Sequence, residues 1–115
     1  MSDLASLQQK LHQFADERDW NQFHSPKNIA MALMVEVGEL LEHFQWLTED
    51  ESNNLAEDQL AEVAEEIADV QLYLIRLADK LNVDIFKAAH AKIDKNAEKY
   101  PVSKAKGKAD KYNRL

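Results

Sequence analysis

Residues 60–81 read LAEVAEEIADVQLYLIRLADKL, and this stretch decides the class of fold. Its large apolar side chains recur every three or four positions, which is the spacing of one face of an α-helix. Neither glycine nor proline interrupts it, and Asn82, directly after it, can end a helix by adopting a left-handed backbone. We therefore expect one long amphipathic helix whose apolar stripe comprises Leu60, Val63, Ile67, Val70, Leu74, Leu77 and Leu81.

Two further helices are expected before this stretch. Leucines at helical spacing predict a first helix from about Asp3 to Asp19. Ser25 and Pro26 then form a start signal, because serine can cap free backbone N–H groups and proline is pre-set for the first turn. The apolar stripe of this second helix consists of Ile29, Leu33, Val37, Leu40, Leu41 and Phe44.

Capping signals mark the remaining elements. Thr48 with Glu51 three residues later resembles a capping box, so a short helix or turn is expected within residues 49–58. Asp84 can cap a last long helix, which the Tyr100-Pro101 step should stop.

The predicted fold is all-α and resembles a four-helix bundle, because no alternating run of β-branched residues offers a sheet. Residues 1–101 are expected to form a single helical domain, and the Lys-rich residues 102–115 a basic tail that is extended or mobile. A domain of 115 residues can bury a core of its own, but oligomerisation would add to its stability.

Composition excludes several function classes. With no cysteine, the chain can have neither disulfides nor thiolate chemistry. The net charge of −7 argues against nucleic acid as a partner, and the absence of a long apolar run argues against a membrane span. No signal pattern opens the chain, so a cytoplasmic location is expected. Charge is unevenly spread, since residues 1–91 carry a net −12 and residues 92–115 a net +5.

Two acidic pairs are candidate ligands of a metal ion. Glu36 and Glu39 recur thirty positions later as Glu66 and Asp69, each pair three residues apart at the edge of an apolar stripe. If the two helices pack antiparallel, the four carboxylates converge, and their repulsion requires a cation or protons. Oxygen ligands of this kind suit Mg²⁺. The alternative is a solvated acidic face, which is common because glutamate favours helices.

Competing chemistries lack their motifs. A di-iron carboxylate bundle needs Glu-x-x-His on two helices, and no glutamate here has a histidine three residues later. His43 follows Glu39 by four residues and could at most join a different site. A Walker-type phosphate loop is absent too, so a triphosphate would be held by metal and side chains.

Aromatic residues flank the second predicted helix. Trp20 and His24 precede it and Trp46 follows it, where each could either stack on a nucleotide base or close the core. Tyr73, one turn beyond Asp69, should point its hydroxyl toward the carboxylates.

The surrounding motifs resemble the MazG-like all-α nucleoside triphosphate pyrophosphohydrolases, and within them the dCTP pyrophosphatase branch. The resemblance extends from about Phe14 to Tyr112. It is carried by Arg18-Asp19-Trp20-Asn21-Gln22-Phe23-His24, Glu36-Val37-Gly38-Glu39-Leu40, Phe44-Gln45-Trp46, Glu65-Glu66-Ile67-Ala68-Asp69-Val70 and Lys99-Tyr100-Pro101-Val102.

The resemblance implies an Mg²⁺-dependent hydrolase that converts a (d)NTP and water into the (d)NMP and pyrophosphate, as house-cleaning of the nucleotide pool. It also implies a homo-oligomer, either a dimer or a tetramer built as a dimer of dimers, whose sites draw on more than one subunit. The implied metal ligands and catalytic residues are Glu36, Glu39, Glu66 and Asp69, and the implied nucleotide pocket consists of Trp20, His24, Trp46 and Tyr73. Two alternatives stay open: a helical oligomerisation module without activity, and a nucleotide sensor that does not hydrolyse its ligand.

Overall fold

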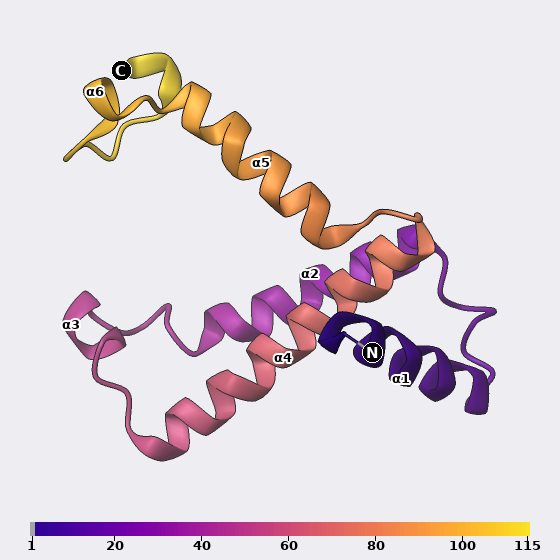
Figure 1. Cartoon of the computed structure of the whole chain (residues 1–115). Coiled ribbons are helices and arrows are strands. Elements are labelled where there is room, and N and C mark those ends of the chain that lie inside the picture. The colour runs from indigo at the N-terminus through magenta and orange to yellow at the C-terminus, as the bar shows by residue number, and fades with distance from the viewer. Residues whose placement is uncertain (1) are drawn as a thin grey trace. The chain divides into compact units, whose positions relative to one another are not determined.

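The computed structural model describes residues 2–115, and within that range it contains helices and connecting segments but no strand (Figure 1). This confirms the predicted all-α class. The elements are α1 (Asp3–Glu17), α2 (Pro26–Glu42), α3 (Glu49–Ser52), α4 (Glu57–Lys80), α5 (Ile85–Lys99), α6 (Val102–Ala105) and the 3₁₀ helix η1 (Tyr112–Arg114). The chain divides into two compact units, one ending at Asn82 and the other Val83–Leu115.

The predicted helix ends are confirmed at the level of hydrogen bonds. The Ser25 hydroxyl accepts the backbone N–H of Asn28 at 3.1 Å, which starts α2. Thr48 and Glu51 form the reciprocal capping box at the start of α3. Asn82, which follows the C-cap residue Leu81 of α4, adopts a φ of 55° in the left-handed region.

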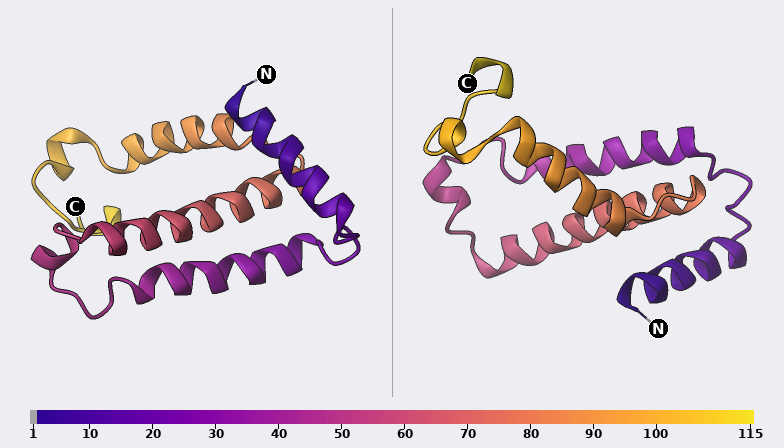
Figure 2. Two further views of the ribbon diagram at one scale, coloured as in Figure 1. Left: turned by 90° about the horizontal axis from the view of Figure 1, so that it is seen from below. Right: turned by 45° about the horizontal axis from the view of Figure 1, so that its top comes forward.

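The first unit is built around α2 and α4, which run antiparallel and side by side in all views (Figures 1 and 2). Helix α1 lies obliquely against the C-terminal half of α4, and His12 of α1 is paired there with Asp79. Among residues 2–115, the buried apolar side chains all lie on these three helices; they are Ala15, Ile29, Val63 and Ile75.

The second unit consists of α5, α6 and η1. Tyr112 of η1 packs edge-on against Tyr100, with ring centroids 6.2 Å apart, and the Lys99 ammonium lies 5.1 Å from the centre of the Tyr112 ring. The sequence predicts an extended or mobile tail, whereas the structure contains two short helical turns after Pro101. The aromatic pair holds the chain end against α5, a contact that no apolar stripe reveals. The division into a domain of residues 1–101 and a tail of 102–115 stays a prediction.

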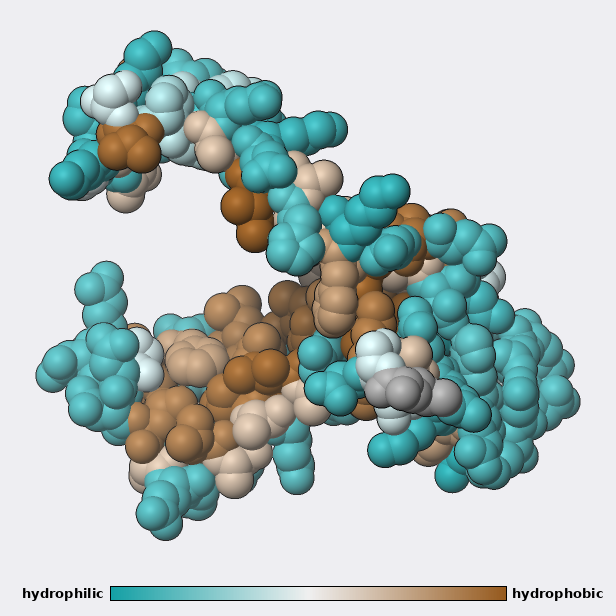
Figure 3. Space-filling model, viewed as in Figure 1, coloured by the Kyte–Doolittle hydropathy of each residue, from teal (hydrophilic) through white to brown (hydrophobic). Residues whose placement is uncertain are grey.

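Apolar side chains remain exposed on α2 and α4 (Figure 3). On α2 they include Met31, Met34, Val35 and Leu41, and on α4 Leu60, Ile67 and Leu74. No helix in the described range combines the length and apolar character needed to cross a bilayer. The predicted cytoplasmic location is untested and stays a prediction.

Candidate active site

Three of the four predicted acids converge. Glu36 and Glu39 of α2 and Glu66 of α4 each contribute one carboxylate oxygen to a group in which all oxygens lie within 4.8 Å of one another. The geometry follows from the sequence, because each acid sits beside the apolar stripe that packs α2 against α4. Antiparallel packing then sets the two acidic pairs opposite each other.

Asp69 lies one turn beyond Glu66 on α4, at the border between this cluster and a neighbouring pocket that it helps to line. It is outside the group of three oxygens. Its charge nevertheless reaches the cluster, since it contributes to the raised pKa of both Glu36 and Glu66. The four acids therefore form one electrostatic unit.

Burial and the crowding of the acids make the charged forms of Glu36 and Glu66 unfavourable. Partial burial is the main cause that raises the pKa of Glu36, followed by a hydrogen bond with Glu39 and the charges of Glu39, Asp69 and Glu66. Burial also leads in raising the pKa of Glu66. One buried oxygen in each of these two residues, Oε2, has no hydrogen-bond partner. Unsatisfied carboxylate oxygens that share one space fit a hard divalent cation such as Mg²⁺.

His43, at the end of α2, is the only basic neighbour with a contact to the cluster among residues 2–115. Its Nε2 lies 4.0 Å from Glu66 Oε1, and its Nδ1 lies 4.0 Å from Glu62 Oε2. Its charge lowers the pKa of Glu66 slightly, against the larger effects of burial and the neighbouring acids. The sequence placed His43 at most in a different site, and only the packing of α2 on α4 brings it next to Glu66.

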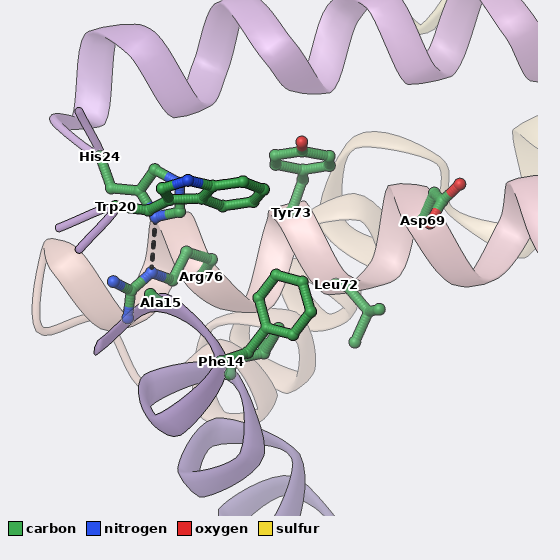
Figure 4. Close-up of a pocket in the computed structure, with 9 residues that line it drawn as sticks. Phe14, Ala15, Trp20, His24, Asp69, Leu72, Tyr73 and Arg76 are labelled. Atoms are coloured by element: carbon green, nitrogen blue, oxygen red, sulfur yellow. Dashed lines mark hydrogen bonds between the residues drawn. The ribbon is translucent and has the colours of Figure 1, made fainter. Parts of the chain in front are cut away.

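A pocket of about 280 Å³ adjoins the acids (Figure 4). Three of the four residues expected around a nucleotide, Trp20, His24 and Tyr73, line it together. The Tyr73 hydroxyl points toward α2, and burial together with the charges of Glu36, Asp69 and Glu39 raises its pKa, so the phenol stays protonated. The remaining lining residues are Leu11, Phe14, Ala15, Asp69, Leu72 and Arg76.

The fourth expected residue, Trp46, lies elsewhere. It follows α2 at the opposite end from Trp20, is 86% exposed and does not line this pocket. Its implied role in nucleotide binding stays a prediction for the single chain.

Sequence reasoning missed Arg76 and Phe14 as pocket residues. Arg76 of α4 is buried, with 6% of its surface exposed, and is the only charged residue so deeply buried in the described chain. A signal was present, because Arg76 follows Tyr73 by three residues and Asp69 by seven and so shares their helix face. Phe14 reaches the pocket through its edge-on contact with Trp20, with ring centroids 5.6 Å apart.

The chain is similar in sequence and in fold to known pyrophosphatases. Residues 31–115 match the model of the MazG-like family. Rat dCTP pyrophosphatase 1 is 45% identical over 109 residues, and the human protein of that name is 43% identical over 109 residues. In both cases the match covers 92% of this chain and 64% of the relative, so the chain spans less than two thirds of the length of these relatives. The solved structure of a pyrophosphatase from Archaeoglobus fulgidus superposes with a TM-score of 0.82 at 41% identity, covering 88% of this chain and 94% of that one.

Proposed function

The chain belongs to the MazG-like family, and on this premise we propose that it is an Mg²⁺-dependent nucleoside triphosphate pyrophosphohydrolase. The reaction converts a (d)NTP and water into the (d)NMP and pyrophosphate. The observation that supports this proposal best is that the acidic cluster, with its unpartnered oxygens, lies next to the aromatic pocket. Asp69 stands between the two. Deoxycytidine triphosphate is the first substrate to test, because the curated relatives are named dCTP pyrophosphatase.

In this proposal the acids would hold the metal beside the triphosphate end of the substrate. Glu36, Glu39, Glu66 and Asp69 would be the ligands, which explains why two of them keep buried oxygens without partners. Bound Mg²⁺ would supply positive charge to the phosphate oxygens and to the departing pyrophosphate. A carboxylate accepts the proton of the attacking water; the candidates are Glu36, Glu39 and Glu65.

The pocket residues bind and orient the nucleoside. Trp20 offers an aromatic face or edge to the base, which is worth about 1 to 3 kcal/mol per stacked base in comparable sites. Tyr73 stays protonated and can donate a hydrogen bond beside Asp69. Positioning of this kind accounts for much of the barrier reduction in phosphoryl transfer.

The active form in this proposal is a homo-oligomer, a dimer or a dimer of dimers. Exposed apolar side chains on α2 and α4 favour association, because a monomer rarely leaves so many of them in water. The exposed Trp46, which stands outside the pocket of its own chain, would then reach the site of a neighbouring subunit.

A substrate panel tests the activity. The purified protein is incubated with Mg²⁺ and each of the common NTPs and dNTPs, and the products are identified as pyrophosphate or phosphate. We expect pyrophosphate, with dCTP among the best substrates. Release of phosphate would indicate a different reaction. Binding without any product would identify a nucleotide sensor, and neither binding nor an effect of Mg²⁺ on the melting temperature would identify an oligomerisation module.

A further inference from the structure

Arg76 is a buried cation without a carboxylate partner. No ion pair of the described chain includes it, and its two hydrogen bonds go to neutral side chains. Its Nη2 donates to Asn21 Oδ1, and its Nε donates to His24 Nδ1 at 3.4 Å. Figure 4 shows the second bond at the end of the pocket where His24 and Trp20 meet. Burying a guanidinium in this way is costly, so its contacts call for an explanation.

The orientation of Asn21 follows from its neighbours. The Asn21 Nδ2 group donates to a carboxylate oxygen of Asp16, and its Oδ1 accepts from Arg76. A carboxylate can only accept and a guanidinium can only donate, so this amide orientation is the one that satisfies both. Asp16 therefore orients Asn21, and Asn21 holds the Arg76 guanidinium in place beside His24.

The same donor logic applies to His24. Since Arg76 Nε–H can only donate, His24 Nδ1 must accept and carries no proton. The proton of the neutral imidazole is then on Nε2, and the ring presents a donor to the pocket that it lines. A doubly protonated ring would lose this bond and face the Arg76 charge. The pKa of His24 is accordingly lowered, first by burial and then by the charges of Arg76 and Lys80.

We propose that Arg76 is a positioning residue that fixes His24 as its neutral Nε2–H tautomer, so that His24 donates a hydrogen bond to an acceptor on the base edge of the bound nucleotide. The base is the partner because this end of the pocket is aromatic and apolar, with Phe14 and Trp20, whereas the acids lie beyond Asp69. Cytosine offers O2 and N3 as acceptors. The ligand assignment rests on the proposed function, but the tautomer assignment does not.

The tautomer is measured on the 115-residue chain without nucleotide, by ¹⁵N chemical shifts of its imidazole nitrogens over about pH 5 to 8. The variant His24→Gln identifies the His24 signals among the four histidines. We expect a protonated Nε2, a bare Nδ1 and titration below the ordinary 6.5. The other charged or titratable groups around His24 are Lys80, Asp69 and Tyr73 from α4 and Asp16 from α1. A protonated Nδ1 in the wild type would overturn the proposal whatever the enzyme hydrolyses.

Two variants of Arg76 show whether its hydrogen bond to His24, and not merely its positive charge, fixes the tautomer. Arg76→Met removes the donor, and we expect mixed tautomers and a higher His24 pKa; Arg76→Lys keeps a donor and should retain part of the wild-type pattern. Lys80→Met is the matched control, because Lys80 carries the same charge one turn later, is exposed and does not donate the recorded hydrogen bond to the His24 ring, which comes from Arg76. It should leave the tautomer unchanged. An unchanged tautomer in folded Arg76→Met, or an equal change in Lys80→Met, would overturn the proposal.

Kinetics test the ligand assignment. With the best substrate of the panel, Arg76→Met should raise KM roughly tenfold, the value of one good hydrogen bond, while kcat changes less than threefold. His24→Gln should raise KM similarly, and the double variant should be no worse than either single one. Additive losses in the double variant, or a fall in kcat alone, would contradict a shared role in base binding. If no triphosphate is hydrolysed, the proposed function fails while the tautomer result stands.

Discussion

At the scale of single residues, the partly buried carboxylates of Glu36 and Glu66 distinguish the candidate site. Glu36 and Glu66 each keep one oxygen from water without a hydrogen-bond partner, although both lie beside other acids. An arrangement chosen for stability alone would avoid this, because a carboxylate oxygen that is shielded from water and has no hydrogen-bond partner is destabilising. Two predictions belong to this scale.

The first concerns turnover. Glu39→Gln and Asp69→Asn should each lower kcat at least about 100-fold at saturating Mg²⁺, because each removes a negative ligand without changing shape. Circular dichroism should show intact helices. Glu42→Gln is the matched control, since Glu42 is exposed on α2 three residues after Glu39, and it should keep full activity. Wild-type turnover in both site variants would remove the carboxylates from the mechanism.

The second concerns pH. The raised pKa of Glu36 and Glu66 means that the folded chain binds more protons than the unfolded chain above the ordinary value of 4.5. In metal-free buffer these two groups should therefore make the protein more stable as the pH falls from about 8 toward 4.5. His24 acts in the opposite direction below 6.5, because its pKa is lowered.

Thermal melts of the wild type and Glu36→Gln separate these effects, since both proteins contain His24. The advantage of the variant in melting temperature should be largest at pH 8 and should shrink as the pH falls. Added Mg²⁺ should stabilise the wild type more at pH 8 than at pH 5, because its ligands must be deprotonated. A difference in melting temperature between the two proteins that does not depend on pH would contradict a raised pKa of Glu36.

At the scale of elements, the helix ends place the functional residues. Ser25 starts α2 immediately after His24, so the pocket loop is held at the point where the cap forms. Asn28 reinforces this start, because its side chain donates to the Phe23 carbonyl at 3.0 Å. The exposed Gly38 between the two acids of α2 has open space where a Cβ would stand, so close packing within the chain does not require a glycine there.

Removal of the α2 cap tests this scale. Ser25→Ala should lower the free energy of unfolding by about 1 kcal/mol, because the Asn28 N–H loses its acceptor. Ser25→Asp can still accept that N–H and serves as the control, with a loss of less than about 0.5 kcal/mol. Urea unfolding curves followed by circular dichroism give both values. Equal stability of Ser25→Ala and wild type would show that the bond contributes nothing to the helix.

At the scale of the whole molecule, the balance between core and surface matters most. Few side chains are fully buried, while many large apolar ones on α2 and α4 are exposed. Apolar burial is the main favourable term in folding, so a chain with this distribution gains most by covering those faces with another copy.

Disruption of the exposed apolar face tests the assembly. Met34, which is 68% exposed on α2, is a suitable position, and Met34→Glu should shift the molar mass in sedimentation or light scattering from a multiple of 13.2 kDa toward one subunit. Lys27→Gln changes the net charge by the same amount on the exposed start of α2 and should leave the assembly intact. A monomeric wild type would contradict the proposed oligomer.

The sequence by itself determined the all-α class, the positions of the long helices and the presence of one acidic pair beside the apolar stripe of each of α2 and α4. These follow from local rules: the period of the apolar stripe, the caps at Ser25 and Asp84, and the spacing of glutamates along one helix face. Only the tertiary structure decided that Asp69 stands apart from the group of three oxygens, that Trp46 lies outside the pocket and that Arg76 is buried against His24. The reason is physical, because helical periodicity assigns a residue to a face, whereas the distance between residues on different helices depends on how those helices cross.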